Sequence, residues 1–390
     1  MELNMYNVQF GDCFLLDEPK AGQALLVDFG SDTPDILKPV ADKIAKRCDG
    51  RELSVLLTHF HQDHINGFWK SDLPDLVNVR TVYLPDIMAM RKTATQLDFL
   101  QLEVLRDLLS SVVLERRPAE ITLYTLLDKL VRAGSRAVFL QRGCPFDLLS
   151  ARFQVLWPDF SVLNIHPRVE KGFVSLLEDL GLWEVPARFS DGEKVRVRIE
   201  PVDHFIDRLT HAYSLLAEGG TELAREALPA LGESLEELGQ YIRERVGAPS
   251  DTLLARLKER MAAAKNQGNR LSIVFQDEAV GGSSRLLMTG DAAAPDLRRI
   301  INHKVEDFPG FYFSQKYAAI KAPHHGTGSH FLPDLSDCQT ILVSNGEPAL
   351  RHLGWGKYPT CTAASTTATG AAKSSAPIPG ASLKKRSAKR

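Results

Sequence analysis

The pattern of apolar and polar residues near the N-terminus alternates between strand-like runs and helical spacing. Apolar runs at 8–16 and 24–30 predict two strands joined by a turn at 19–22. Apolar residues at helical spacing predict a helix over 36–48, and the run at 54–58 predicts a short strand. A cluster of histidines therefore begins immediately beyond the C-terminal end of a strand.

The rest of the chain returns to strands after long helical stretches. The leucine pattern predicts amphipathic helices at 95–116 and 119–133, and short strands fall within 137–157. A mainly helical stretch follows before the strand pattern returns at 271–275, 285–289, 318–321 and 340–343. A helical block between two β-rich stretches predicts an insertion, at about 160–267, in one domain that spans 1–358.

The composition is that of an ordinary globular protein. The 390 residues are 44% hydrophobic and 25% charged, which allows a sizeable core. No stretch approaches the ~18 consecutive apolar residues of a membrane span. The N-terminus shows no basic region followed by an apolar core, so no secretory signal is visible. The five cysteines are scattered and suggest neither a disulfide framework nor a cysteine metal site. We expect a cytoplasmic protein that does not act at a membrane.

The charge of the chain is unevenly distributed. Residues 359–390 are rich in Ala, Ser, Thr and Pro with a basic end, and they predict a disordered tail. The remainder is mildly acidic, which argues against a broad surface that coats nucleic acid. This mildly acidic net charge still allows a local groove that binds nucleic acid.

The run His59-Phe-His61-Gln-Asp63-His64 concentrates metal ligands within six residues. In an extended segment, residues two apart project to the same side, so His59 and His61 can bind one metal ion. Where the chain then turns, Asp63 and His64 can reach a second ion. Imidazole and carboxylate suit zinc, manganese or iron. A polar loop with surface histidines is the alternative, and the concentration of ligands disfavours it.

This run resembles the HxHxDH signature of the metallo-β-lactamase superfamily. Asp28 matches the early aspartate that supports the histidine loop, Asp291 the carboxylate that bridges two metals, and His325 the last histidine ligand. The resemblance covers about residues 2–346 apart from the helical block. It implies an α/β fold, an αββα sandwich, with two divalent ions, Zn or Mn. The implied metal ligands are His59, His61, Asp63, His64, Asp291 and His325.

Further motifs resemble one branch of the superfamily, the soluble hydrolase domain of ComEC-type DNA-uptake proteins. They are Phe10-Gly-Asp12, Val155-Leu-Trp-Pro158, Asn269-Arg-Leu-Ser272, Thr289-Gly-Asp291 and Pro323-His-His-Gly326. That branch is associated with nuclease or phosphodiesterase activity. The membrane channel that accompanies the domain has no counterpart in this sequence, so the resemblance implies no role in DNA import.

The resemblance also assigns roles. Two cations would activate a water molecule, and Asp63 would hold a metal and orient that water. His324 could deliver a proton to the leaving group, position a phosphate, or only support the neighbouring ligand. Lys321 could contact an anionic substrate or be a solvated strand residue. His330 and His352 are expected near the mouth of the site.

One departure from the superfamily pattern concerns the first metal. Many members place a histidine, often in a Gly-His-Thr run, before the bridging aspartate, and this run is absent here. Asn269 and Ser272 occupy the equivalent stretch, which leaves a water or an amide oxygen as the missing ligand. His204 is the other candidate.

Two enzymatic hypotheses share this site. The first is a nuclease or phosphodiesterase acting on nucleic acid or nucleotide, and the second is a hydrolase of a small ester, lactone, thioester or amide. A third hypothesis is a regulatory protein with a vestigial metal site. The six ligand positions all hold competent residues, which disfavours the third.

Overall fold

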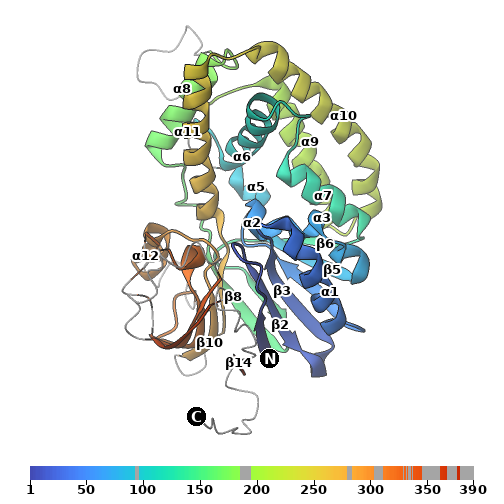
Figure 1. Cartoon of the computed structure of the whole chain (residues 1–390), viewed down its shortest axis with the longest axis vertical. Helices are drawn as coiled ribbons and strands as arrows, with labels where there is room; N and C mark the ends of the chain where they lie inside the picture. The colour runs from blue at the N-terminus through green and yellow to red at the C-terminus, as the bar shows by residue number, and fades with distance from the viewer. Residues whose placement is uncertain are drawn as a thin grey trace. The chain divides into compact units, whose positions relative to one another are not determined.

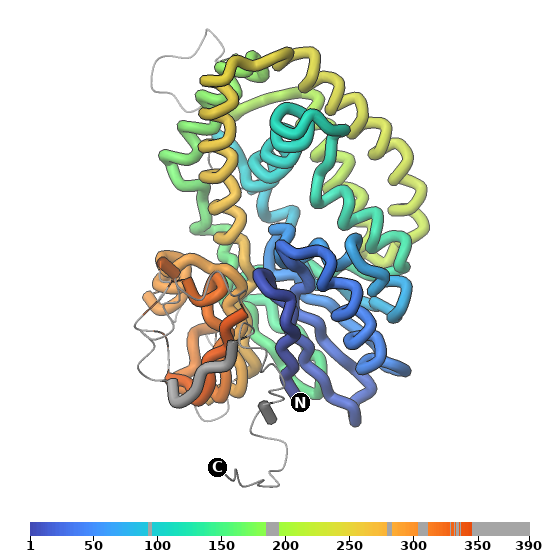
Figure 2. The backbone as a smooth tube through the Cα atoms, in the orientation of Figure 1, coloured from blue at the N-terminus to red at the C-terminus, as the bar shows by residue number. Residues whose placement is uncertain are grey.

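A computed structural model describes most of the chain and divides it into two compact units. The described residues are 1–92, 96–184, 195–278, 283–302, 311–327, 329–330, 332, 335 and 337–344, with the backbone of strands at 361–366 and 376–377. The first unit comprises Met1–Tyr83, Leu140–Pro158 and Ser272–Arg390, and the second Leu84–Phe139 and Asp159–Leu271. The chain leaves the first unit twice and returns twice (Figures 1 and 2).

Two mixed seven-stranded sheets form the framework of the fold. The first has the order β14-β1-β2-β3-β4-β5-β6. Its strands are β1 (Glu2–Met5), β2 (Cys13–Glu18), β3 (Gln23–Phe29), β4 (Glu52–Leu56), β5 (Val79–Pro85), β6 (Arg136–Leu140) and β14 (Ala376–Pro377). The second has the order β13-β12-β11-β10-β9-β8-β7. Its strands are β7 (Pro145–Leu148), β8 (Ala151–Trp157), β9 (Val274–Asp277), β10 (Ser283–Met288), β11 (Lys316–Lys321), β12 (Asp337–Val343) and β13 (Cys361–Thr366).

Strands β3 and β4, near the centre of the first sheet, are buried on both faces over most of their length. β3 and β4 pair in parallel, with Val27 opposite Leu56, and both residues are buried. Strands buried on both sides read as continuous apolar runs, which is how the sequence predicted them. The two sheets meet through aromatic rings, since Tyr83 of β5 lies 4.9 Å from Phe146 of β7 between ring centroids.

Helices cover the sheets of the first unit. In α1 (Leu37–Arg47) the buried residues include Leu37, Val40 and Ile44, which form one helical face. The same pattern recurs in α12 (Ala294–Asn302), where Leu297 and Ile300 are buried. Figure 1 shows α1 beside the first sheet and α12 beside the second. The α/β fold class predicted from the resemblance is confirmed as a layered arrangement of two sheets flanked by helices.

Short helices complete the connections of the first unit. They are α2 (Gln62–Ile65), α3 (Gly67–Lys70), α4 (Leu73–Leu76), and the 3-10 turns η1 (Pro19–Ala21), η2 (Pro34–Ile36) and η5 (Pro323–Gly326). Of these, α2 and η5 carry candidate metal ligands. Each of the two follows a strand, β4 for α2 and β11 for η5.

The second unit is a helical bundle around α6. Its elements are α5 (Ile87–Met90), α6 (Phe99–Leu108), the π-helical turn η3 (Leu109–Leu114), α7 (Thr122–Arg132), α8 (Pro167–Asp179), α9 (Glu200–Ala217), α10 (Thr221–Val246), α11 (Asp251–Gly268) and the 3-10 turn η4 (Asn269–Leu271). A reciprocal capping box between Asp98 and Gln101 starts α6. α6 contacts α7, α9 and α11, and nearly all of its residues are buried. A helix that is buried all round belongs to the core of its unit.

The helical block expected at 160–267 clusters with residues 84–139 in the second unit. The predicted boundary of a single domain at 358 stays a prediction. Within the stretch predicted as a tail, the structure describes β13, which pairs with β12, and β14, which pairs with β1. The other residues of that stretch lie outside the described part of the chain.

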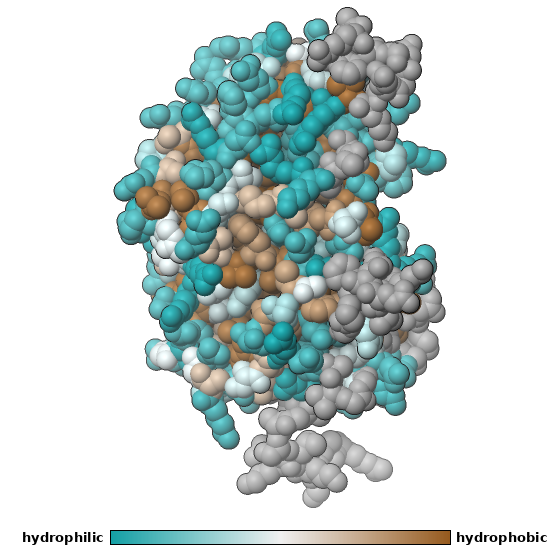
Figure 3. All heavy atoms as spheres, turned by 180° about the vertical axis from the view of Figure 1, so that it is seen from behind, coloured by the Kyte–Doolittle hydropathy of each residue, from teal (hydrophilic) through white to brown (hydrophobic). Residues whose placement is uncertain are grey.

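The described helices are all too short or too polar to cross a membrane. Hydrophilic side chains cover much of the face shown in Figure 3, and hydrophobic residues reach the surface in patches between them. The cytoplasmic location stays a prediction.

Candidate metal centre

The histidine run lies where β4 ends and the chain turns into α2. His61 is extended, with φ −78° and ψ 147°, and the helix begins at the next residue. Gly30 packs so closely against the backbone of Asp63 and His64 that a Cβ atom there would overlap it. The backbone amide of Asp12 also donates a hydrogen bond to the carbonyl oxygen of Asp63, at 3.2 Å. The loop is thus fixed by the ends of β2 and β3.

Four buried side chains bring ligand atoms together within 4.8 Å of one another: Asp63, His64, Asp291 and His325. Asp291 Oδ2 lies 3.2 Å from His64 Nε2 and 3.5 Å from His325 Nε2. Asp63 Oδ2 lies 3.4 Å from His325 Nε2. Asp63 and His64 are neighbours in the sequence, whereas Asp291 and His325 come from distant segments, and the structure brings the four together.

Two turns with positive φ angles place Asp291 and His325 in the cluster. Gly290, just after β10, adopts φ +51° and packs against Ser272, so a side chain there would be both strained and crowded. His324 and His325 follow β11 with φ of 45° and 54°, a conformation that few residues other than glycine adopt. Such strain persists only where the surroundings enforce it, and it clusters at functional sites.

His59 and His61 stand beside this group. The ring centroid of His59 lies 4.4 Å from that of His61 and 4.2 Å from that of His64. Thr58 Oγ1 contacts His59 Nδ1 at 3.0 Å, which leaves Nε2 as the free ligand atom. Both histidines are buried.

Asp28 supports the cluster from behind, the position that the resemblance implied. Its Oδ2 contacts His64 Nδ1 at 2.8 Å and accepts a hydrogen bond from Thr58 Oγ1 at 2.7 Å. Its Oδ1 accepts from the backbone amide of Thr58, also at 2.7 Å. Asp28 therefore orients His64 so that Nε2 faces Asp291. This arrangement, in which a carboxylate holds the far nitrogen of a histidine, is typical of metal ligands.

A buried lysine lies on the other side of Asp291. Lys321 is 1% exposed, so it is not the solvated strand residue that one interpretation of the sequence held. Its Nζ lies 2.6 Å from Asp12 Oδ2 and 3.3 Å from Asp291 Oδ1, and it donates to the carbonyl oxygen of Gly290 at 2.7 Å. A direct contact of Lys321 with substrate stays a prediction.

Sequence reasoning did not assign Asp12 to the site. It is fully buried, and besides its contact with Lys321 its Oδ1 lies 3.3 Å from His325 Nδ1. The same nitrogen also contacts the carbonyl oxygen of Ser344 at 2.8 Å. The sequence feature that could have identified Asp12 is its place directly before the apolar strand β2, within the Phe10-Gly-Asp12 motif.

The charges of the centre depend on one another. Burial alone would raise the pKa of Asp291, but His325, His64 and Lys321 outweigh it and hold that pKa well below its usual range. Burial would lower the pKa of His325, yet Asp291 and Asp12 raise it to about 10. Burial, together with His64 and His61, lowers the pKa of His59 well below its usual value. Burial would also lower the pKa of His64, but Asp291, Asp28 and Asp12 raise it well above its usual value. Without cations, the carboxylates therefore keep His64 and His325 protonated.

The donor set fits divalent metal ions. Among the described residues, His59 Nε2, Asp63 Oδ1, His64 Nε2 and His325 Nε2 are buried ligand atoms without a hydrogen-bond partner. Buried polar atoms are costly unless something satisfies them. Imidazole nitrogen and carboxylate oxygen together are typical ligands of zinc and manganese. These residues could therefore hold cations in the space between them.

His324 lies at the edge of the cluster and is 28% exposed in its side chain. Its Nε2 lies 3.7 Å from Asp291 Oδ2, and its Nδ1 contacts Thr327 Oγ1 at 2.8 Å. Burial lowers its pKa, more than Asp291 raises it. A neutral imidazole here can face a substrate beside Asp291.

The residues considered for the missing ligand are divided between the units. Ser272, in the first unit, accepts a hydrogen bond from the backbone amide of Asp291 at 3.0 Å and lies 3.4 Å from His59 Nδ1. Ser272 therefore contacts two candidate ligands, Asp291 and His59. Asn269 and His204 belong to the second unit, Asn269 buried and His204 exposed on α9, so their part in the metal site stays a prediction. His352 lies outside the described residues.

Comparison with models of known protein families and with curated protein sequences finds no match to this chain. The resemblance to a superfamily therefore stays a prediction.

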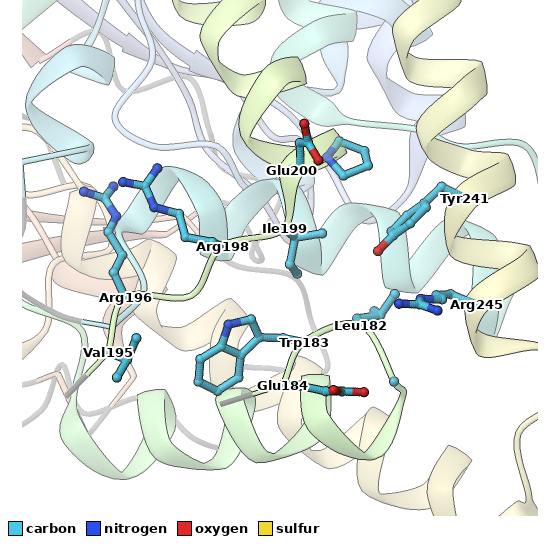
Figure 4. Close-up of a pocket in the computed structure, with 12 residues that line it drawn as sticks. Leu182, Trp183, Glu184, Val195, Arg196, Arg198, Ile199, Glu200, Tyr241 and Arg245 are labelled. Atoms are coloured by element: carbon cyan, nitrogen blue, oxygen red, sulfur yellow. The ribbon is translucent and has the colours of Figure 1, made fainter. Parts of the chain in front are cut away.

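A separate cavity of about 630 Å³ lies within the second unit (Figure 4). Arg198, Arg245, Glu184 and Glu200 are among its lining residues, so the charges around it offset one another. Arg196 also lines it, but its guanidinium is held by Asp98 at 2.6 Å. We assign no chemistry to this cavity.

Proposed function

We propose that this chain is a metal-dependent hydrolase of the metallo-β-lactamase superfamily, with nuclease or phosphodiesterase activity on nucleic acid or nucleotide. The observation that carries the proposal is the convergence of Asp63, His64, Asp291 and His325, whose ligand atoms lie within 4.8 Å of one another. Together with His59 and His61 they supply enough donors for two divalent cations, Zn or Mn. When bound, such cations polarise the substrate and lower the pKa of water.

The formal charge of the centre supports two cations rather than one. Among the described residues, its buried charged side chains are the carboxylates of Asp12, Asp28, Asp63 and Asp291 and the ammonium of Lys321. With neutral imidazoles, the balance is three negative charges. Two divalent cations reverse it to one positive charge, which an anionic substrate can neutralise. An uncharged ester is attracted less strongly by this positive charge than an anionic substrate, and for that reason we favour a phosphodiester.

The residues of the chain have distinct parts in this proposal. His59, His61, His64 and His325 would hold the cations. Asp291 and Asp63 would also hold the cations, and Asp63 would orient the attacking water. His324 would donate a hydrogen bond or a proton to the group beside Asp291.

The experiment is an activity panel on the full chain after loading with Mn²⁺ or Zn²⁺. The substrates are single-stranded DNA, duplex DNA, RNA, a cyclic dinucleotide and a generic carboxylic ester, and Asp291→Asn is tested alongside. We expect metal-dependent cleavage of at least one phosphodiester and none by the variant. If only the ester is cleaved, the proposed phosphodiesterase activity is wrong and the protein is an esterase. Cleavage that persists in Asp291→Asn or in chelator would refute the proposed centre.

A further inference from the structure

A chain of polar side chains runs from the metal centre along the segment after η5. His324 Nδ1 contacts Thr327 Oγ1 at 2.8 Å, and Thr327 Oγ1 contacts His330 Nδ1 at 3.1 Å. Ser329 Oγ contacts the same nitrogen of His330 at 3.0 Å. The sequence analysis placed His330 only near the mouth of the site, and the metal centre as described makes no use of it.

The backbone holds this chain in place. The amide of Thr327 donates to the carbonyl oxygen of His324 at 3.0 Å, and the amide of His330 donates to that of Thr327 at 3.1 Å. The two imidazole rings lie 4.1 Å apart between centroids, tilted by 36°. The hydroxyl of Thr327 is therefore placed between the two histidines by the fold.

One hydroxyl has a single proton, so it can donate to only one of the two histidines and must accept from the other. A neutral imidazole likewise has one N–H, and the nitrogen that carries it is set by the hydrogen bond of the other nitrogen. Only two consistent arrangements follow. Either His324 carries its proton on Nε2, toward Asp291, or it carries it on Nδ1, toward Thr327.

The surroundings favour the first arrangement. His324 Nε2 lies 3.7 Å from Asp291 Oδ2, where an N–H is attracted and a lone pair repelled by the carboxylate. At the other end, burial and then His324 lower the pKa of His330 to about 4, so His330 is neutral near pH 7. Its Nδ1–H can donate toward both Thr327 Oγ1 and Ser329 Oγ.

We propose that Thr327 and His330 are positioning residues that hold His324 as a hydrogen-bond donor and prevent it from acting as a metal ligand. His330 Nδ1–H donates to Thr327 Oγ1, the Thr327 hydroxyl donates to His324 Nδ1, and His324 presents Nε2–H beside Asp291. The consequence for catalysis rests on the proposed function, because a donor at this point would stabilise charge on a reacting group. The tautomer itself does not depend on hydrolysis.

The test is nuclear magnetic resonance of the full chain labelled with ¹⁵N in histidine, first without added metal. A ring nitrogen that carries a proton resonates apart from one that does not, and His324→Gln identifies the signals of His324. We expect Nε2 to be protonated and Nδ1 bare. A proton on Nδ1 of His324 in the wild type would overturn the proposal.

Variants distinguish the effect of the hydrogen bonds through Thr327 from an effect of side-chain packing. Thr327→Val removes the hydroxyl at nearly constant volume, and Thr327→Ser retains it. We expect both tautomers of His324 in Thr327→Val and in His330→Ala, and the single wild-type tautomer in Thr327→Ser. Ser329→Ala removes the other hydroxyl beside His330 Nδ1 and keeps Thr327, so as the matched control it should leave His324 unchanged. A wild-type spectrum of His324 in both Thr327→Val and His330→Ala would refute the positioning role. Circular dichroism confirms that each variant folds.

Addition of Zn²⁺ to the same labelled protein distinguishes this inference from the proposed function. We expect the signals of His64 and His325 to shift as metal ligands while His324 keeps its proton on Nε2. If His324 Nε2 loses its proton and shifts like the ligands, the donor proposal fails and the metal centre stands. If neither His64 nor His325 shifts, the metal centre itself fails, and the metal-free spectra still decide the tautomer.

Discussion

The ammonium nitrogen of Lys321 lies 3.3 Å from Asp291 Oδ1, within the protein interior. The other oxygen of Asp291 faces His64 and His325. Lys321 therefore contacts one oxygen of this carboxylate and leaves the second beside the two histidines. It also supplies a buried ammonium charge among the carboxylates of the centre.

Replacing Lys321 by Met should destabilise the metal-free protein strongly. The change leaves Asp12 and Asp291 without their buried cation, and breaking such a pair costs about 3–5 kcal/mol. Divalent cations can then take over part of the missing positive charge. We therefore expect added Zn²⁺ to raise the melting temperature more in Lys321→Met than in the wild type.

Thermal melts with and without Zn²⁺ test this expectation. Lys316→Met is the matched control, because Lys316 lies on the same strand and is exposed. A Lys321→Met protein as stable as that control without metal would contradict the structural role of the ion pair.

Replacing Asp28 by Asn should weaken metal binding without abolishing the fold. Asp28 contacts His64 Nδ1 at 2.8 Å, and loss of such a supporting carboxylate typically lowers metal affinity by about 10–100-fold. Competition with a chromophoric chelator measures the affinity. Asp35→Asn, at an exposed aspartate, controls for charge. Equal affinities in the two variants would exclude the supporting role.

Metal binding should release protons, and its affinity should rise with pH. In the metal-free centre Asp291 and Asp12 raise the pKa of His325 from 6.5 to about 10, so at pH 7 this histidine is protonated. A cation needs the lone pair and must displace that proton. The raised pKa also stabilises the metal-free fold below about pH 6.5, and this contribution is lost as the pH rises through about 10.

Titration calorimetry in two buffers of different ionisation enthalpy counts the protons released at pH 7. We expect at least one proton per chain and tighter binding at pH 8 than at pH 6. Binding that is independent of both buffer and pH would show that the imidazoles are not the ligands.

Replacing Asp63 by Ala should abolish hydrolysis while the fold persists. The side chain lies in the turn at the start of α2 and contacts His325 Nε2 at 3.4 Å. Its loss removes a metal ligand and the group that orients the water, so we expect turnover to fall by about a thousandfold or more. Turnover of the substrate found by the panel, beside a thermal melt, is the measurement. Wild-type turnover in a folded Asp63→Ala protein would refute the assigned role.

The positions of core strands could be predicted because each is a local apolar run, and the sequence placed β3, β4 and β10 within a few residues. The fold class followed from the resemblance of the motifs. β1 was missed because Glu2–Met5 alternates and offers only four residues. The first four candidate ligands could be found because histidines and an aspartate stand within six residues, at 59–64. Asp291 and His325 lie far away in the sequence and were found through the resemblance.

The environment of Asp291 could not be predicted, because it depends on contacts across the fold. A lysine at the end of a strand has the same local pattern whether it is solvated or paired, and only the fold brings Lys321 to Asp12. The contact of Thr327 with two histidines depends equally on the turn after His325, whose positive φ no apolar pattern reveals.

The number of divalent ions bound per chain tests the central claim most directly. Metal analysis by mass spectrometry, after equilibration with Zn²⁺ or Mn²⁺ and removal of free ions, should give two per wild-type chain. Asp291→Asn should hold fewer, because Oδ2 of this residue faces both His64 and His325. A wild-type chain that retains no ion, or an Asp291→Asn chain that retains both, would contradict the account of this protein as a metal-dependent hydrolase.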